Sequence, residues 1–238
     1  MLPLSLPGPP SALKLLFLGA HSDDIEIGCG GTALRLLSEH PGAEVTWVVF
    51  SAVATPERER EARAGAALFL QQARRQRVIT LDFRDGYFPY DGARIKDAFE
   101  QLKSEIDPHL IFTHHRDDRH QDHRIISDLT WNTWRNHLIF EYEIPKYDGD
   151  LGTPNCFVPL TPAGGALKVK HILDVFRSQR GKSWMTEDAL LALMRLRGLE
   201  CAAPDKYAEA FHCRKFVAAV GAPPLRAGAV AQTEPENS

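Results

Sequence analysis

Short apolar runs alternate with longer helix-like segments along the first half of the chain. The runs are uninterrupted and end in polar or glycine-rich residues, which predicts buried strands. They lie at residues 15–18, 44–50, 78–81 and 109–113. Helical spacing and stop signals predict helices between them, from near residue 32 to before residue 40, over 57–75 and over 93–106. Strands alternating with helices of this length favour an α/β, Rossmann-like fold, with a mostly parallel sheet and helices on both faces.

The pattern loosens after residue 126. A helix carries Trp131 and Trp134, and the segment 145–162 is rich in turn residues. Strands are expected over 138–144 and 216–220, and helices over 166–179 and 186–197. The chain shows neither an internal repeat nor a linker. We therefore expect a single α/β domain over 12–220 with an elaborated C-terminal part, a flexible lead-in over 1–11 and a flexible tail over 221–238.

Composition narrows the class of protein. The 238 residues are 44% hydrophobic and 25% charged, as in an ordinary soluble globular protein. A net charge of -3 argues against a nucleic-acid partner. No apolar run is long enough to span a membrane, and residues 1–11 lack the basic region of a secretory signal, so we expect a cytoplasmic location. The four cysteines form no CxxC pair and are expected to be free thiols.

A histidine and two carboxylates stand directly after the first predicted strand. They are His21, Asp23 and Asp24, and the glycine-rich residues 28–31 follow. In an open α/β sheet, ligands bind in the crevice beyond the carboxyl ends of the strands. The glycines do not fit GxGxxG, and the carboxylates before them would repel a pyrophosphate, which disfavours a nucleotide-binding oxidoreductase. We interpret them as a tight turn with close helix packing.

A second polar cluster, His114–Arg124, follows the strand predicted over 109–113. Both clusters should therefore emerge at the same edge of the sheet. Histidine nitrogens and carboxylate oxygens bind zinc, and a catalytic zinc site takes three protein ligands and a water. His21, Asp24 and one histidine of the second cluster would complete such a site. The residues alone do not decide which histidine this is, nor do they separate zinc from ferrous iron or manganese.

Together the two clusters resemble a known family. The sequences AHSDD at 20–24 and GCGG at 28–31, with Asp117 and HQDH at 120–123 downstream, look like the PIG-L/LmbE-type N-acetylglucosaminyl deacetylases. The pattern of that family is A-H-P-D-D-E-x-x-G-C-G-G, followed by H-x-D-H. The resemblance implies a Rossmann-like fold and zinc-dependent hydrolysis of the N-acetyl group of amino sugars.

The resemblance is clear over residues 13–126 and weaker through 207–211. Two departures stand in the first motif. Ser22 replaces the proline of the family, and Ile25 stands where the family has glutamate, with Glu26 one position later. Neither position is a zinc ligand in the family, so the departures concern the support of the loop and the choice of substrate.

The resemblance also implies a role for each matching residue. His21, Asp24 and His123 would bind zinc, and Asp23 would be the general base. Chemistry supports this division, because the proton of a zinc-activated water needs a nearby carboxylate that is not itself a ligand.

Three further residues complete the implied site. His120 would stabilise the transition state and help to protonate the leaving amine, and Asp122 would orient His120. Arg58 matches the arginine of the family motif R-x-x-E-A, which reaches the substrate. Considered without the resemblance, Arg58 could equally be a solvent-exposed residue at the start of a helix, paired with neighbouring charges.

The expected function is therefore removal of an N-acetyl group from an N-acetylated amino sugar or its conjugate. The alternatives are an amidase acting on a different acyl conjugate, and a non-catalytic metal- or sugar-binding module on the same fold. Tyr87, Phe88, Tyr90 and the loop 147–155 fit either an aromatic sugar-binding rim or plain packing. The partner is a small amino sugar or glycoconjugate, and a homo-oligomer is compatible with the sequence.

Overall fold

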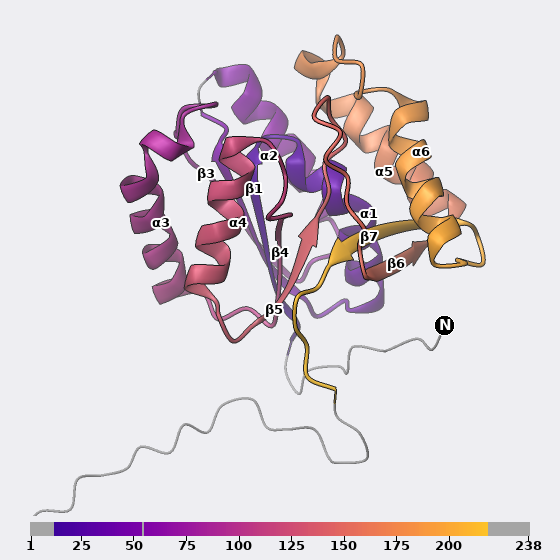
Figure 1. Ribbon diagram of the computed structural model, residues 1–238, viewed down its shortest axis with the longest axis horizontal. Coiled ribbons are helices and arrows are strands. Elements are labelled where there is room, and N and C mark those ends of the chain that lie inside the picture. Colours follow the sequence, from indigo (N-terminus) through magenta and orange to yellow (C-terminus); the bar gives the residue numbers. More distant parts are fainter. Residues whose placement is uncertain (1–11, 54, 219–238) are drawn as a thin grey trace, which may run out of the picture.

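The computed structural model describes residues 12–53 and 55–218. These residues form a seven-stranded sheet of order β3-β2-β1-β4-β5-β7-β6, with helices on both faces (Figure 1). The first five strands in that order are parallel, and β7 is antiparallel to both of its neighbours. The expected α/β fold class is confirmed.

The strands are β1 (Lys14–His21), β2 (Glu44–Ser51), β3 (Arg75–Thr80), β4 (Leu110–His114), β5 (Leu138–Tyr142), β6 (Cys156–Leu160) and β7 (Tyr207–His212). The helices are α1 (Asp24–Glu39), α2 (Pro56–Phe69), α3 (Gly92–Glu105), α4 (Gln121–Thr133), α5 (Pro162–Val175) and α6 (Glu187–Glu200). Two short 3-10 turns are η1 (Phe88–Tyr90) and η2 (Arg177–Gln179).

The sheet separates two hydrophobic cores, and β1 contributes to both. Leu15 and Phe17 pack in the core shared with α1, α2, α5 and α6. Leu16 and Leu18 pack in the core shared with α3 and α4. Because helices cover both faces, β1 buries nearly every side chain, which explains its continuous apolar sequence.

The strand order reverses between β1 and β4. After β1 the chain continues to β2 and β3 on one side, and then returns to place β4 on the other side. This is the topological switch point at which open α/β sheets bind their ligands. β1 ends at His21 and β4 ends at His114, so each strand delivers a histidine to this crevice.

Helix α1 begins at Asp24, well before the start predicted near residue 32. The glycines therefore lie inside the helix and do not precede it, although the helix is kinked at Cys29. The ring of Tyr142 occupies the space beside Gly28, and that of Phe69 the space beside Gly30. The close helix packing expected of these glycines is thus present, but the turn is not.

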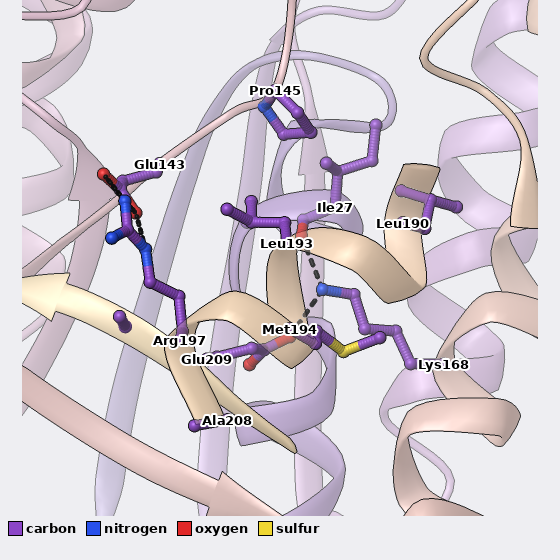
Figure 2. Close-up of a pocket in the computed structure, with 12 residues that line it drawn as sticks. Ile27, Glu143, Pro145, Lys168, Leu190, Leu193, Met194, Arg197, Ala208 and Glu209 are labelled. Atoms are coloured by element: carbon purple, nitrogen blue, oxygen red, sulfur yellow. Dashed lines mark hydrogen bonds and ion pairs between the residues drawn. The ribbon is translucent and has the colours of Figure 1, made fainter. Parts of the chain in front are cut away.

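A buried ion pair supports the kink. Both oxygens of Glu209 on β7 accept backbone N–H groups, from Gly31 at 2.9 Å and from Thr32 at 2.6 Å. Lys168 on α5 donates to Glu209 and to the carbonyl of Ile27, both at 2.6 Å (Figure 2). The small pocket beside this pair is lined by none of the site residues expected from the sequence.

Strand β6 lies within the segment interpreted as turn-rich. Pro159 interrupts its apolar run and has no N–H to donate, which argues against a central strand. However, β6 is the edge of the sheet and pairs only with β7. Proline is tolerated in an edge strand, so Pro159 is compatible with β6. The interpretation of this segment as turns alone was wrong.

The strand predicted over 216–220 is also wrong for its described residues, because 216–218 form no strand. The last strand is β7. Its alanines and Glu209 are weak strand formers, and burial on both faces overrides that preference. The charge of Glu209 is tolerated there because Lys168 neutralises it.

Other boundaries shift less. Helix α2 ends at Phe69 and not near Arg75, because Arg75 already begins β3. The lead-in over 1–11 and the tail over 221–238 lie outside the described residues, and the single-domain assignment stays a prediction. Within the part of the chain that the structure describes, no helix has the length and apolar character needed to cross a membrane.

Gly28→Ala should destabilise the fold by about 1–3 kcal/mol, because overpacking a closed core costs that much. A β-carbon at residue 28 would lie 2.2 Å from Cδ2 of Tyr142, whose ring is fully buried. Gly42→Ala is the control, since a β-carbon there meets nothing within 4 Å. Urea unfolding measures both variants, and equal free energies of unfolding would contradict the close packing at Gly28.

Candidate active site

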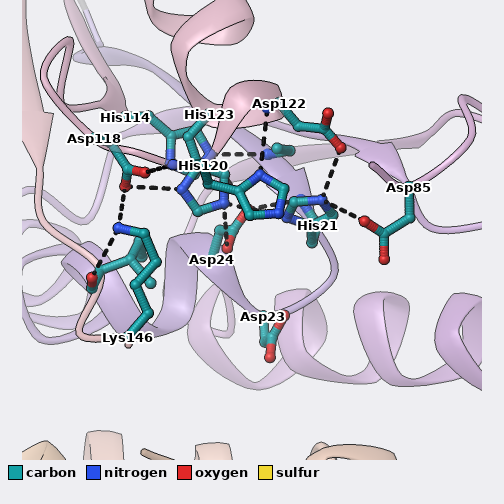
Figure 3. Close-up of polar contacts among 12 residues, drawn as sticks. His21, Asp23, Asp24, Asp85, His114, Asp118, His120, Asp122, His123 and Lys146 are labelled. Carbon is teal, nitrogen blue, oxygen red and sulfur yellow. Dashed lines mark hydrogen bonds and ion pairs between the residues drawn. The ribbon is translucent and has the colours of Figure 1, made fainter. Parts of the chain in front are cut away.

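The two polar clusters meet at the carboxyl ends of β1 and β4 (Figure 3). His21 is the last residue of β1, Asp23 is the N-cap of α1 and Asp24 is its first residue. His120 is the N-cap of α4, and His123 lies in its first turn. Of these side chains, only that of His120 is more than slightly exposed to solvent.

Donor atoms of His21, Asp24 and His123 face one another. Nδ1 of His21 lies 3.2 Å from Nε2 of His123 and 3.3 Å from Oδ2 of Asp24. Nε2 of His123 lies 3.5 Å from Oδ1 of Asp24. Tetrahedral ligands bound at about 2.0–2.2 Å are roughly 3.3–3.6 Å apart, so each pair of side chains has about this spacing, although Asp24 presents Oδ2 to His21 and Oδ1 to His123. Among the described residues, the donor atoms that lie within 4.8 Å of one another form overlapping groups, which include His21 with His120 and His123, and Asp24 with His114 and His123.

Carboxylates behind the two histidines orient their rings. Nδ1 of His123 lies 2.9 Å from Oδ2 of Asp118. Nε2 of His21 lies 3.3 Å from Oδ2 of the buried Asp122 and 3.1 Å from Oδ1 of the exposed Asp85. A neutral histidine that donates through these nitrogens presents the lone pair of its other nitrogen to Asp24. Metal-binding histidines are held in this way. The residues therefore fit a divalent cation such as zinc or ferrous iron.

A largely buried lysine side chain supports the carboxylate of Asp118. Nζ of Lys146 lies 2.9 Å from Oδ2 of Asp118 and 2.5 Å from Oδ2 of Asp150. The sequence interpretation missed Asp118, although it stands two residues before His120 in the second cluster. It also missed Lys146, which lies in the turn-rich segment and carries no signal of its own.

The remaining histidines of the second cluster have other contacts. His114 stacks on His123 with ring centroids 3.9 Å apart, and its Nε2 lies 3.2 Å from Oδ2 of Asp24. Burial, with the neighbouring His123, lowers the pKa of His114 to about 4. Nδ1 of His115 lies 3.1 Å from Oε2 of Glu141, on the next strand. His123 is therefore the histidine of this cluster that faces both His21 and Asp24.

Charges within the cluster reinforce one another. Burial alone would lower the pKa of His21, but the carboxylates of Asp24 and Asp122 help to raise it well above its usual value. Burial alone would raise the pKa of Asp24, but His123, His114 and His21 lower it well below its usual value. Asp24 is therefore ionised, as an anionic metal ligand must be.

Asp23 lies beside this cluster, apart from the three donor atoms (Figure 3). Its Oδ1 accepts a hydrogen bond from Nη2 of Arg58 at 3.2 Å. Burial raises the pKa of Asp23, Arg58 opposes the shift, and Asp24 adds to it. A carboxyl with a raised pKa is a better proton acceptor near neutral pH.

The carboxylate of Asp122 does not hydrogen-bond to His120, the residue it was expected to orient. It accepts the backbone N–H groups of Gly86 at 2.6 Å and Phe88 at 3.1 Å, and it lies 3.3 Å from Nε2 of His21. Nδ1 of His120 accepts the backbone N–H of Asp122 at 3.3 Å. Asp122 thus contacts His120 through its main chain, while its side chain fixes the loop before η1.

The aromatic residues divide between packing and exposure. Phe88 is fully buried and its ring centroid lies 6.1 Å from that of His21, so it supports the site from within. Tyr87 and Tyr90 are exposed. Tyr147 is exposed as well and contacts Trp184 edge to face.

Comparison with known proteins gives the chain a context. Residues 16–134 match the PIG-L family, described as GlcNAc-PI de-N-acetylase. The chain is 29% identical over 143 residues to the uncharacterized deacetylase YaiS of Escherichia coli strain K12, covering 56% of this chain and 74% of YaiS.

Solved structures share the fold. The conserved protein TT1542 from Thermus thermophilus has a TM-score of 0.67 at 23% identity, over 90% of this chain and 100% of that one. N,N'-diacetylchitobiose deacetylase from Pyrococcus horikoshii has a TM-score of 0.66 at 25% identity, and the match covers 85% of this chain and 84% of the deacetylase. GalB, the 4-carboxy-2-hydroxymuconate hydratase of Pseudomonas putida KT2440, has a TM-score of 0.66 at 16% identity, and the match covers 89% of this chain and 100% of GalB. The fold by itself therefore does not fix the reaction.

Asp118→Asn should weaken zinc binding by about 10–100-fold although it removes none of the three metal-binding side chains. Loss of a carboxylate that orients a metal-binding histidine has an effect of this size. Competition of the metal-free protein with a chromophoric chelator measures the affinity. Asp117→Asn is the matched control, since the neighbouring Asp117 side chain is 76% exposed. Equal affinities of the two variants would contradict the orienting role of Asp118.

Proposed function

Because the chain belongs to the PIG-L family, we propose that it is a metal-dependent hydrolase that removes the N-acetyl group from an N-acetylated amino sugar or its conjugate. The observation that carries this proposal is the convergence of His21, Asp24 and His123, with Asp23 and Arg58 directly beside them. The deacetylase names of YaiS and of the chitobiose enzyme support the same reaction class.

His21, Asp24 and His123 would hold the metal, with zinc as the first choice. The orientation of both imidazole rings supports this assignment. When bound there, zinc polarises the amide carbonyl as a Lewis acid and lowers the pKa of water toward about 7. Ferrous iron suits the same ligand set.

Asp23 would act as the general base. Arg58 occupies its Oδ1, and its Oδ2 accepts no hydrogen bond from the described residues. This oxygen is free to take a proton from the attacking water. The raised pKa of the Asp23 carboxyl favours that transfer.

His120 would serve the leaving amine and the developing oxyanion. Its Nδ1 accepts a backbone N–H, so in the neutral ring Nε2 carries the proton and can donate it. Asp122 would position His120 through that N–H, and it also fixes the loop that carries Phe88. Arg58, whose side chain is 20% exposed, would contact the substrate.

Metal content tests the ligand set. His21→Ala and His123→Ala should each lose the zinc that elemental analysis finds at about one per wild-type chain. His115→Ala is the control, because its ring is directed to Glu141. Stoichiometric zinc in folded His123→Ala, judged by circular dichroism, would contradict the assignment.

Acetate release tests the reaction. The zinc-loaded protein should release acetate and free amine in equal amounts from N-acetylglucosamine or N,N'-diacetylchitobiose. Asp23→Asn should keep its zinc and lose about 10²–10⁴-fold in kcat, the usual contribution of a general base. Full activity of this variant would remove Asp23 from the role. If the zinc-loaded wild type released no acetate from any N-acetyl amino sugar, the proposed function would be wrong.

A further inference from the structure

Turn η2, from the second half of the chain, is hydrogen-bonded to helix α2, from the first half. The backbone N–H of Ser178 donates to Oε1 of Glu61 at 2.8 Å. The hydroxyl of Ser178 donates to Oε2 of the same carboxylate at 2.5 Å. Glu61 is only 7% exposed, whereas Ser178 lies at the surface. A buried carboxylate thus has both oxygens engaged by one exposed serine.

Arg58 joins this pair to the proposed general base. Its Nη1 donates to the hydroxyl of Ser178 at 3.4 Å and lies 3.8 Å from Oε2 of Glu61. Its Nη2 donates to Asp23. A serine hydroxyl can accept one hydrogen bond while it donates another, so the two contacts of Ser178 are compatible. A continuous chain of contacts runs from Asp23 through Arg58 and Ser178 to Glu61.

The position of Arg58 creates a need for this support. Arg58 lies in the first turn of α2, where its backbone N–H donates to the capping hydroxyl of Thr55. The positive end of the helix dipole disfavours a guanidinium there. Among the described residues, Arg58 is also the one cation within 4.0 Å of the Glu61 carboxylate. Each group therefore offsets an unfavourable placement of the other.

We propose that Glu61 and Ser178 are positioning residues that hold the guanidinium of Arg58 against Asp23. This inference rests on the deacetylase function proposed above. Glu61 and Ser178 touch no reacting atom; they act by restricting a long side chain that has many rotamers. Turn η2 is then part of the active site, although the proposed metal-binding and catalytic groups all lie between residues 21 and 123.

A double-mutant cycle tests the proposal. In the zinc-loaded protein, Ser178→Ala and Glu61→Gln should each lower kcat/KM for acetate release from N,N'-diacetylchitobiose by about tenfold, as expected for a lost hydrogen bond to a charged group. In an Arg58→Ala background, neither substitution should lower kcat/KM further. Independent structural damage would instead be additive.

Two further variants sharpen the test. Ser178→Thr keeps a hydroxyl and should restore most of the activity that Ser178→Ala loses. Glu59→Gln is the matched control on the same helix, because its carboxylate binds Arg63 and Thr80 and not Arg58. It should leave kcat/KM unchanged. Equal losses with and without Arg58 would overturn the proposal, and so would full activity of Ser178→Ala.

A failure of the proposed deacetylase function can be distinguished from a failure of the positioning role. If the wild type released no acetate, the deacetylase function would be wrong, and crystal structures would then test the positioning role. The contact between Arg58 and Asp23 should be present in the wild type and in Ser178→Thr, and lost in Ser178→Ala. Retention of the contact in Ser178→Ala would overturn the inference.

Discussion

Two parallel strands that end side by side hold the site together. Because the strand order reverses between β1 and β4, no crossover helix covers their carboxyl ends, and the residues that follow each strand face a common crevice. His21 terminates β1 and Asp24 opens α1, while His123 follows β4 in the first turn of α4. The register of the sheet fixes where β1 and β4 run side by side, and the first turns of α1 and α4 carry Asp24 and His123 from there.

Burial of so many charged groups is tolerated because they are arranged in opposite pairs. Asp24 lies among three histidines, and Asp118 joins His123 to Lys146. Glu26 is the exception, since both of its oxygens are buried without a partner among the described residues and burial raises its pKa well above the usual value. The raised pKa favours the neutral form of Glu26, which reduces the cost of burying it without a partner.

The second half of the chain fixes groups that the first half provides. Lys146 and Ser178 lie beyond residue 134, where the family match ends. One contacts the carboxylate behind His123, and the other contacts Arg58. Glu209 on β7 binds the backbone of α1 at its kink. The loop after β5, turn η2 and strand β7 thus support a site to which they contribute no proposed catalytic group.

Hydrophobic periodicity and motif spacing are local properties of the chain, so the five parallel strands, the two polar clusters that follow β1 and β4, and the family could all be predicted from the sequence. The sequence held no indication of which carboxylate stands behind which histidine, nor of the strand at 207–212, whose Glu209 is tolerated only because Lys168 lies against it. Ser178 and Glu61 are 117 residues apart in the sequence. Tertiary packing alone selects these partners, because a buried polar group pairs with whatever the fold brings within hydrogen-bond distance, and no local pattern encodes that choice.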